Sequence, residues 1–122
     1  MTVRELIEIY LDGWRLGTAA RSLQACAPGF YYDDPNTGRI ARSEFPDFVE
    51  DFKAYGASLN GGVVPSPFLE YTHTVIDAAQ SPATIWCWWR VNNTRFQGTA
   101  LVQANATGVL WERIAYYAPL PQ

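Results

Sequence analysis

Residues 85–91 read Ile-Trp-Cys-Trp-Trp-Arg-Val, and this stretch decides the class of fold. Aromatic and β-branched residues at this density favour a β-strand. Because successive side chains of a strand point to opposite faces, one face carries Trp86, Trp88 and Arg90. The other face carries Ile85, Cys87, Trp89 and Val91. Both faces are apolar, so we expect helices to cover one and a second copy of the sheet to cover the other, giving a homodimer.

Similar stretches surround this strand in the second half of the chain. The expected strands are residues 68–77, 84–91, 95–104 and 109–117. Turn-forming pairs separate them, at Ser81-Pro82, Asn92-Asn93 and Thr107-Gly108. This order predicts an antiparallel meander. The two glycosylation sequons, at Asn92 and Asn105, are interpreted as turn sequences.

Helical patterns occupy the first half. Thr2 and Glu5 form a capping box that opens an amphipathic helix, and Gly17 ends it. A second helix is expected from Thr18 through Cys26 to a stop at residues 28–29. A third is expected to be capped by Ser43, to tolerate Pro46 in its first turn and to end at Gly56. Between them, an extended stretch at residues 30–32 runs into a turn-rich loop at residues 33–38. We therefore expect one α+β domain, residues 1–122, with three N-terminal helices on one face of the sheet.

Composition excludes several classes of function. The net charge is -3 without a basic stripe, so neither a nucleic-acid nor a membrane partner is expected. The N-terminus shows no signal-peptide pattern, and no apolar run approaches the roughly 20 residues that span a bilayer. Cys26 and Cys87 match no metal-binding spacing and are interpreted as buried thiols. We expect a cytoplasmic protein that needs no metal or cofactor.

The order of elements and two local sequences carry a resemblance. Residues 107–117 resemble a C-terminal hairpin in which a turn glycine precedes an aromatic strand. Residues 30–35 resemble a loop at the mouth of a pocket in which an acid precedes a proline. In these features the chain resembles the nuclear transport factor 2-like superfamily, which includes steroid delta-isomerase and the SnoaL-like polyketide cyclases. The resemblance implies a cone-shaped α+β barrel, in which helices pack into a strongly curved antiparallel sheet around an internal pocket.

The resemblance also implies catalytic residues. Asp34 takes the place of the general base of the steroid isomerases, and Tyr10 that of their tyrosine oxyanion donor. The chain departs from the isomerases at residues 95–101, which contain no acid where those enzymes add a protonated aspartate. Alternative readings stay open: Asp34 as the acceptor of an Asx turn, Asp33 as the inward-facing acid, and Tyr10 as a core tyrosine.

The aromatic density predicts a pocket for a flat or cyclic apolar molecule. His73 is either a ligand contact or a structural histidine whose hydrogen bonds are satisfied within the fold. Arg113 is either a ligand contact or part of an ion pair or a cation–π contact. Alternation places His73 on one face with Leu69 and Tyr71. The expected ligand-binding residues are Trp14, Tyr32, Phe52, His73, Trp88, Arg113 and Tyr117. The expected function is an isomerase, dehydratase or cyclase that uses Asp34 to move a proton, with a non-catalytic ligand binder or a scaffold as alternatives.

Overall fold

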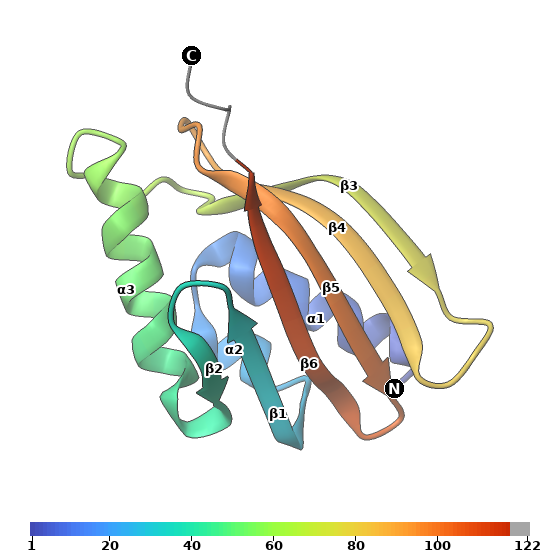
Figure 1. The fold of residues 1–122 in the computed structure, drawn as a ribbon. Helices are drawn as coiled ribbons and strands as arrows, with labels where there is room; N and C mark the ends of the chain where they lie inside the picture. The colour runs from blue at the N-terminus through green and yellow to red at the C-terminus, as the bar shows by residue number, and fades with distance from the viewer. Residues whose placement is uncertain (118–122) are drawn as a thin grey trace.

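A computed structural model describes residues 1–117, with three α-helices and a six-stranded sheet (Figure 1). The helices are α1 (Val3–Leu16), α2 (Ala19–Leu23) and α3 (Phe45–Ser58), and a 3-10 turn, η1 (Arg42–Glu44), precedes α3. The strands are β1 (Cys26–Asp34), β2 (Gly38–Ala41), β3 (Leu69–Asp77), β4 (Ala83–Val91), β5 (Gln97–Asn105) and β6 (Gly108–Tyr117). The expected α+β class is confirmed.

The sheet has the order β2-β1-β6-β5-β4-β3 and is mixed. The four expected strands after Pro67 form the antiparallel meander β3 to β6, within two residues of the expected bounds. The expectation of a wholly antiparallel sheet is wrong, because β1 adds to β6 in parallel and β2 then pairs back on β1. The residues expected to end a helix, Pro28 and Gly29, instead lie in β1, where its pairing with β6 is irregular.

Helix ends follow local chemistry only in part. The capping box of Thr2 and Glu5 is present, and Gly17 ends α1 in the left-handed conformation. The second helix stops at Leu23, short of the expected Cys26, because Cys26 pairs with Val109 of β6. Ser43 does not cap α3. It lies in η1, and α3 runs two residues past Gly56.

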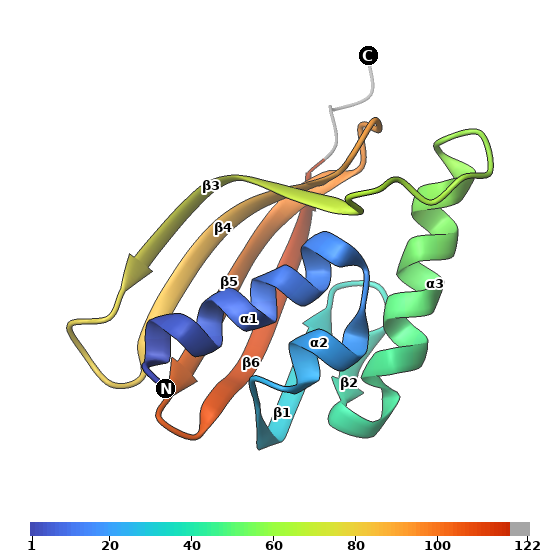
Figure 2. The same ribbon diagram turned by 180° about the vertical axis from the view of Figure 1, so that it is seen from behind.

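The two faces of the sheet differ in what covers them. Figure 2 shows α1 crossing the face around which the long strands bend. As the alternation in β4 predicts, Ile85, Cys87 and Trp89 are buried on this inner face. Trp86 points to the outer face, where no helix lies, and is 56% exposed.

An irregularity in β3 overturns one prediction. The register of β3 against β4 shifts between Tyr71 and His73. A β-bulge of this kind inserts one extra residue, so the alternation of faces reverses beyond it. Tyr71 is therefore on the inner face, whereas His73 pairs with Trp88 and is exposed. The grouping of His73 with Leu69 and Tyr71 is wrong for this reason.

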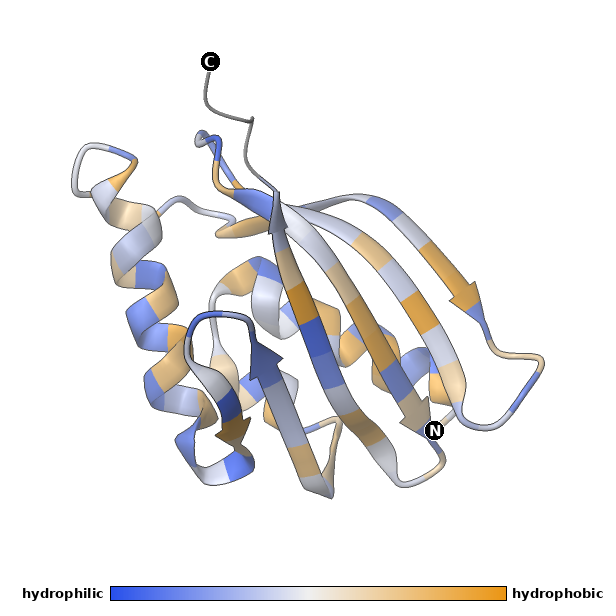
Figure 3. Ribbon diagram, in the orientation of Figure 1, coloured by the Kyte–Doolittle hydropathy of each residue, from blue (hydrophilic) through white to orange (hydrophobic). Residues whose placement is uncertain are grey.

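Aromatic rings fill much of the space between the helices and the sheet. Phe45, at the start of α3, lies with its ring centre 5.2 to 6.5 Å from those of four others. These neighbours are Tyr10, Trp14, Phe30 and Tyr32. The contacts with Trp14 and Phe30 are edge-to-face, and aromatic pairs of this kind stabilise a core beyond the area that they bury. A hydrophilic segment nevertheless interrupts β6 in the middle of the sheet (Figure 3).

Within residues 1–117, none of the helices combines the length and apolarity needed to cross a bilayer.

We predict that Gly13→Ala destabilises the protein although alanine is the better helix former by about 1 kcal/mol. A Cβ at position 13 would lie 1.9 Å from Ser22 Oγ and 2.4 Å from Ser22 N, so α1 and α2 would have to separate. Overpacking of this kind costs about 1–3 kcal/mol. The measurement is urea unfolding, with Gly29→Ala as the control, because nothing lies within 4 Å of a Cβ at position 29. A Gly13→Ala variant at least as stable as the wild type would contradict the close packing of α1 on α2.

Candidate functional site

A pocket of about 850 Å³ lies between α3 and the adjacent ends of β1 and β6, beside the turn that joins β4 to β5. We call it the outer pocket. Six aromatic side chains contribute to its wall, and three charged residues, Asp34, Asp51 and Arg95, line it. The remaining lining residues are Asn36, Thr37, Phe48, Phe52, Tyr55, Leu59, Thr94, Phe96, Tyr116 and Tyr117.

Asp34 ends β1 at the wall of this pocket and is only 4% exposed. Its Oδ1 accepts hydrogen bonds from the backbone amides of Asn36 (2.8 Å) and Thr37 (2.9 Å). Its Oδ2 accepts a hydrogen bond from the Tyr116 hydroxyl. Asp34 is therefore both the acceptor of the Asx turn that joins β1 to β2 and a pocket residue, so the two readings of the sequence are compatible.

Asp33 points to the opposite face of the sheet. Its carboxylate contacts Arg39 Nε at 2.9 Å and Arg113 Nε at 3.3 Å. The hydrogen bond from Arg39 contributes most to lowering the pKa of Asp33. Arg113 also lies over the Trp111 ring, at 4.4 Å from its centre. Between the two acids, Asp34 is the one that lines the outer pocket.

Tyr10 lies in a different part of the molecule from Asp34. It is fully buried, and its hydroxyl donates a hydrogen bond to Oε1 of Glu112. Trp14 Nε1 donates to the same hydroxyl at 3.3 Å. Tyr10 does not line the outer pocket. The structure therefore does not bring the expected pair, Tyr10 and Asp34, to one space.

Glu112 is the functional candidate that the sequence did not single out. It is 3% exposed, on the inner face of β6. Burial raises the pKa of its carboxyl to about 7, and the hydrogen bond from Tyr10, whose hydroxyl in turn accepts from Trp14, opposes this shift. In the sequence, Glu112 stands beside Arg113, a setting in which an acid ordinarily forms a surface ion pair. The signal that could have identified it is alternation, because Glu112 shares its face with buried Ile114.

A second, much smaller space adjoins Glu112. We call it the inner chamber. Its volume is about 10 Å³, and it is lined by Trp14, Tyr32, Phe52, Leu69, Tyr71, Trp89 and Glu112. Two hydrogen-bond donors of its lining residues, the Tyr71 hydroxyl and Trp89 Nε1, are buried without a partner. Phe52 is the one residue that lines both the chamber and the outer pocket.

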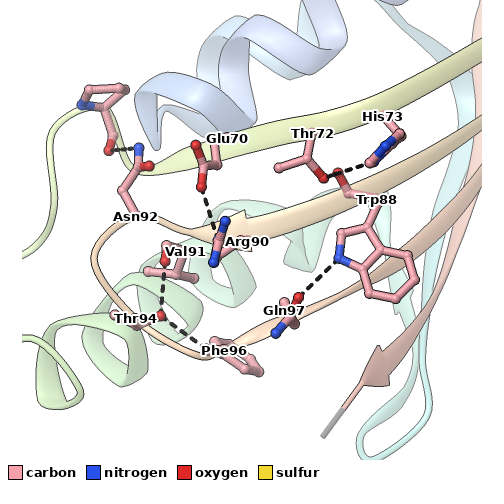
Figure 4. A network of polar contacts seen from close by, with 11 residues as sticks. Glu70, Thr72, His73, Trp88, Arg90, Val91, Asn92, Thr94, Phe96 and Gln97 are labelled. Carbon is pink, nitrogen blue, oxygen red and sulfur yellow. Dashed lines mark hydrogen bonds and ion pairs between the residues drawn. The ribbon is translucent and has the colours of Figure 1, made fainter.

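The other expected ligand residues divide between these spaces and the outer face. Tyr117 and Phe52 line the outer pocket, whereas Trp14 and Tyr32 line the inner chamber. Figure 4 shows two of the others on the outer face of the sheet, where Trp88 donates to Gln97 at 3.0 Å and His73 contacts Thr72 at 3.3 Å. Arg113 lies on that face as well.

Among residues 1–117, no group of three or more histidine, cysteine or acidic side chains is placed to hold a metal ion. Cys26 and Cys87 are buried free thiols. Burial raises the pKa of each to about 12, which keeps both in the unreactive thiol form at neutral pH.

The arrangement of helices over a mixed sheet, with a pocket at one end, is the nuclear transport factor 2-like fold. No protein-family model and no curated protein sequence matches the chain. Among solved structures, it is similar to a nuclear transport factor 2-like protein from Anabaena variabilis ATCC 29413 (TM-score 0.63, 9% identity, 95% of this chain and 87% of that one). It is also similar to a ketosteroid isomerase-like protein from Erwinia carotovora atroseptica SCRI1043 (TM-score 0.59, 11% identity, 97% of this chain and 95% of that one). A third similar structure is that of a SnoaL-like family protein from Agrobacterium tumefaciens str. C58 (TM-score 0.63, 14% identity, 95% of this chain and 97% of that one). The expected fold family is thereby confirmed.

We predict that Glu112 makes stability depend on pH near neutrality. In the unfolded chain its pKa returns to the ordinary value of 4.5, so between about pH 4.5 and 7 the folded protein holds a proton that the unfolded chain has released. The free energy of unfolding should therefore fall as the pH rises through this window and level off above it. One pKa unit corresponds to about 1.4 kcal/mol, so the decrease is on the order of 3 kcal/mol.

Urea unfolding from pH 5 to pH 8 measures this decrease, and Glu112→Gln should remove it. The surrounding Tyr10, Tyr32, Tyr71, Cys26 and Cys87 have pKa values raised by burial and stay neutral throughout the window. Glu50→Gln, at an exposed position on α3, is the control and should keep the wild-type profile. An unchanged profile in Glu112→Gln would show that this carboxyl is not responsible.

Proposed function

We propose that the protein binds a small, flat, predominantly apolar molecule in the outer pocket. One observation supports this most directly: a space of about 850 Å³ is walled by aromatic side chains and carries few charges. Small-molecule sites in proteins have volumes of about 300–1,000 Å³ and are lined mainly by apolar and aromatic groups with a few polar ones. Phe96 and Tyr116, stacked with ring centres 5.3 Å apart, give the wall a flat surface.

A second candidate function is proton transfer at a carbon atom of the bound molecule, with Asp34 as the base. It is favoured by the position of Asp34, a nearly buried carboxylate in the wall of an apolar pocket, hydrogen-bonded to a tyrosine. The structural relatives include a protein named as ketosteroid isomerase-like. In this chain Tyr116, rather than Tyr10, is the tyrosine that contacts Asp34 at the pocket.

One experiment separates the two functions. We expect 2-tetralone, a flat bicyclic ketone with exchangeable protons beside its carbonyl, to bind the wild-type protein. If Asp34 is a base, the protein also accelerates deuterium exchange at those carbons, measured by NMR in D₂O. Asp34→Asn should then lower the exchange rate by about 10²–10⁴-fold, the usual contribution of a general base.

The matched control is Asp51→Asn, which removes a second, exposed carboxylate from the wall of the same pocket. It should leave the exchange rate at the wild-type level. Binding without accelerated exchange would identify a non-catalytic ligand binder. Absence of binding would contradict the proposed function itself.

We also propose that two copies of the chain associate through the outer face of the sheet. Large apolar side chains are exposed there, Val75 by 65%, Trp86 by 56% and Tyr117 by 51%. Charged groups of this face form ion pairs, Arg90 with Glu70 at 2.9 Å (Figure 4), and Asp33 with both Arg39 and Arg113. Pairing of opposite charges lessens the repulsion between two copies of the face, and exposed apolar patches mark association sites.

We predict that Trp86→Lys converts the dimer to a monomer, because it places a charge at the centre of an apolar interface. Light scattering after size-exclusion chromatography measures the mass in solution. Leu16→Lys, at an exposed apolar position at the end of α1, is the control and should remain dimeric. A wild-type protein that is monomeric at every concentration would refute the interface.

A further inference from the structure

We infer that the inner chamber is the subsite for one uncharged oxygen atom, a hydroxyl or carbonyl, of the molecule that the outer pocket holds. The inference rests on the proposed binding function and names the chemistry of the ligand's inner end. It assigns roles to Glu112, Tyr71 and Trp89, and it makes Phe52 the gate between the two spaces.

The buried donors point to an oxygen acceptor. An unpaired buried donor costs about 1–3 kcal/mol, and folded proteins pair the large majority of such groups. Here two such donors, the Tyr71 hydroxyl and Trp89 Nε1, belong to side chains that line the same small space. An indole N–H can only donate, so the group that satisfies Trp89 must be an acceptor.

The size and charge of the chamber define that acceptor further. A volume of about 10 Å³ holds roughly one water-sized group and excludes a carboxylate or phosphate. The carboxyl of Glu112 lines the same space. When ionised it would repel an anion and accept a hydrogen bond from a hydroxyl, and when protonated it would donate to a carbonyl. An uncharged hydroxyl or carbonyl oxygen is therefore compatible with both the ionised and the protonated form of Glu112.

Contacts of the Phe52 ring show why it is the gate. On the chamber side, its centre lies 5.2 Å from that of Trp14 and 5.6 Å from that of Trp89. On the pocket side, it lies 5.2 Å from Phe96 and 6.0 Å from Phe48. A ring that contacts both walls lies between the two spaces, and its displacement would join them.

The test compares two probes that differ at one group, 2-naphthol and 2-methylnaphthalene. An apolar site alone favours the methyl compound, because burying an unpaired hydroxyl costs free energy. A site that pairs the hydroxyl should instead bind 2-naphthol roughly tenfold more tightly, the ratio expected for one to two net hydrogen bonds. Equilibrium dialysis gives both dissociation constants.

Two variants assign the preference to the chamber. Tyr71→Phe removes only the hydroxyl and should lose most of the preference for 2-naphthol while leaving the affinity for 2-methylnaphthalene unchanged. Glu112→Gln should weaken 2-naphthol in the same selective way. Tyr31→Phe is the matched control, since Tyr31 lies under Arg39, with its ring centre 3.8 Å from the guanidinium carbon, and does not line the chamber. It should keep the wild-type ratio.

Each outcome decides something. If both probes bind and the methyl compound binds as tightly or more tightly, the oxygen subsite is refuted and the apolar pocket stands. The same holds if Tyr71→Phe keeps the full preference. If neither probe binds, the proposed binding function fails together with this inference. Stopped-flow binding tests the gate: Phe52→Ala should bind 2-naphthol severalfold faster than the wild type, and equal rates would show that the ring closes nothing.

Discussion

The carboxyl group of Glu112 lies among aromatic rings between α1 and the sheet, where it accepts a hydrogen bond from Tyr10. Leaving a buried carboxyl unpaired is costly, so this bond fixes which turn of α1 lies over β6. The position of α1 in turn places Trp14 against Phe45 and Phe52 of α3. The wall that α3 gives to the outer pocket therefore depends on a polar contact in the middle of the core.

The interior holds two spaces of different character, and Phe52 is in the lining of both. The outer pocket is large and carries its acid, Asp34, at the end of a strand, where the β1–β2 turn holds it in place. The inner chamber is about the size of one water molecule, and its acid is held by a helix. The first space suits the apolar body of a ligand, and the second suits a single polar atom. The likeness to solved structures, below 20% identity, establishes the fold and no function.

Local patterns in the sequence predicted the elements well where local chemistry decides them. The capping box at Thr2, the end of α1 at Gly17 and the faces of β4 all follow from rules that span a few residues. Three predictions were wrong at positions where partners distant in the sequence determine the secondary structure or the face of a strand. Cys26 leaves the helix because β6 offers it a strand partner, and the sheet is mixed because β1 pairs in parallel with β6 while it pairs antiparallel with β2. The bulge beyond Tyr71 reversed the face of His73.

Some residues of the candidate site could be predicted from the sequence and others could not. The acid-plus-proline loop led to Asp34, which does line a pocket. The resemblance paired Tyr10 with Asp34 as catalytic residues, but the Tyr10 hydroxyl points to Glu112 instead. The sequence did not predict Glu112 as a site residue, because an acid beside an arginine on a strand ordinarily lies on a solvent-exposed face. Only the position of α1 over that part of β6 makes it a core residue.

Glu112 is a buried carboxyl, and burial should keep its proton in place up to about neutral pH. Carbon NMR of protein labelled at the glutamate carboxyls measures this directly, with Glu112→Gln to assign the signal. We predict one glutamate that titrates with a pKa of about 7, well above the ordinary value of 4.5, and whose signal disappears in the variant. A Glu112 signal that titrates near 4.5 would contradict it, because the carboxyl would then be open to water and the inner chamber would not exist as an enclosed site.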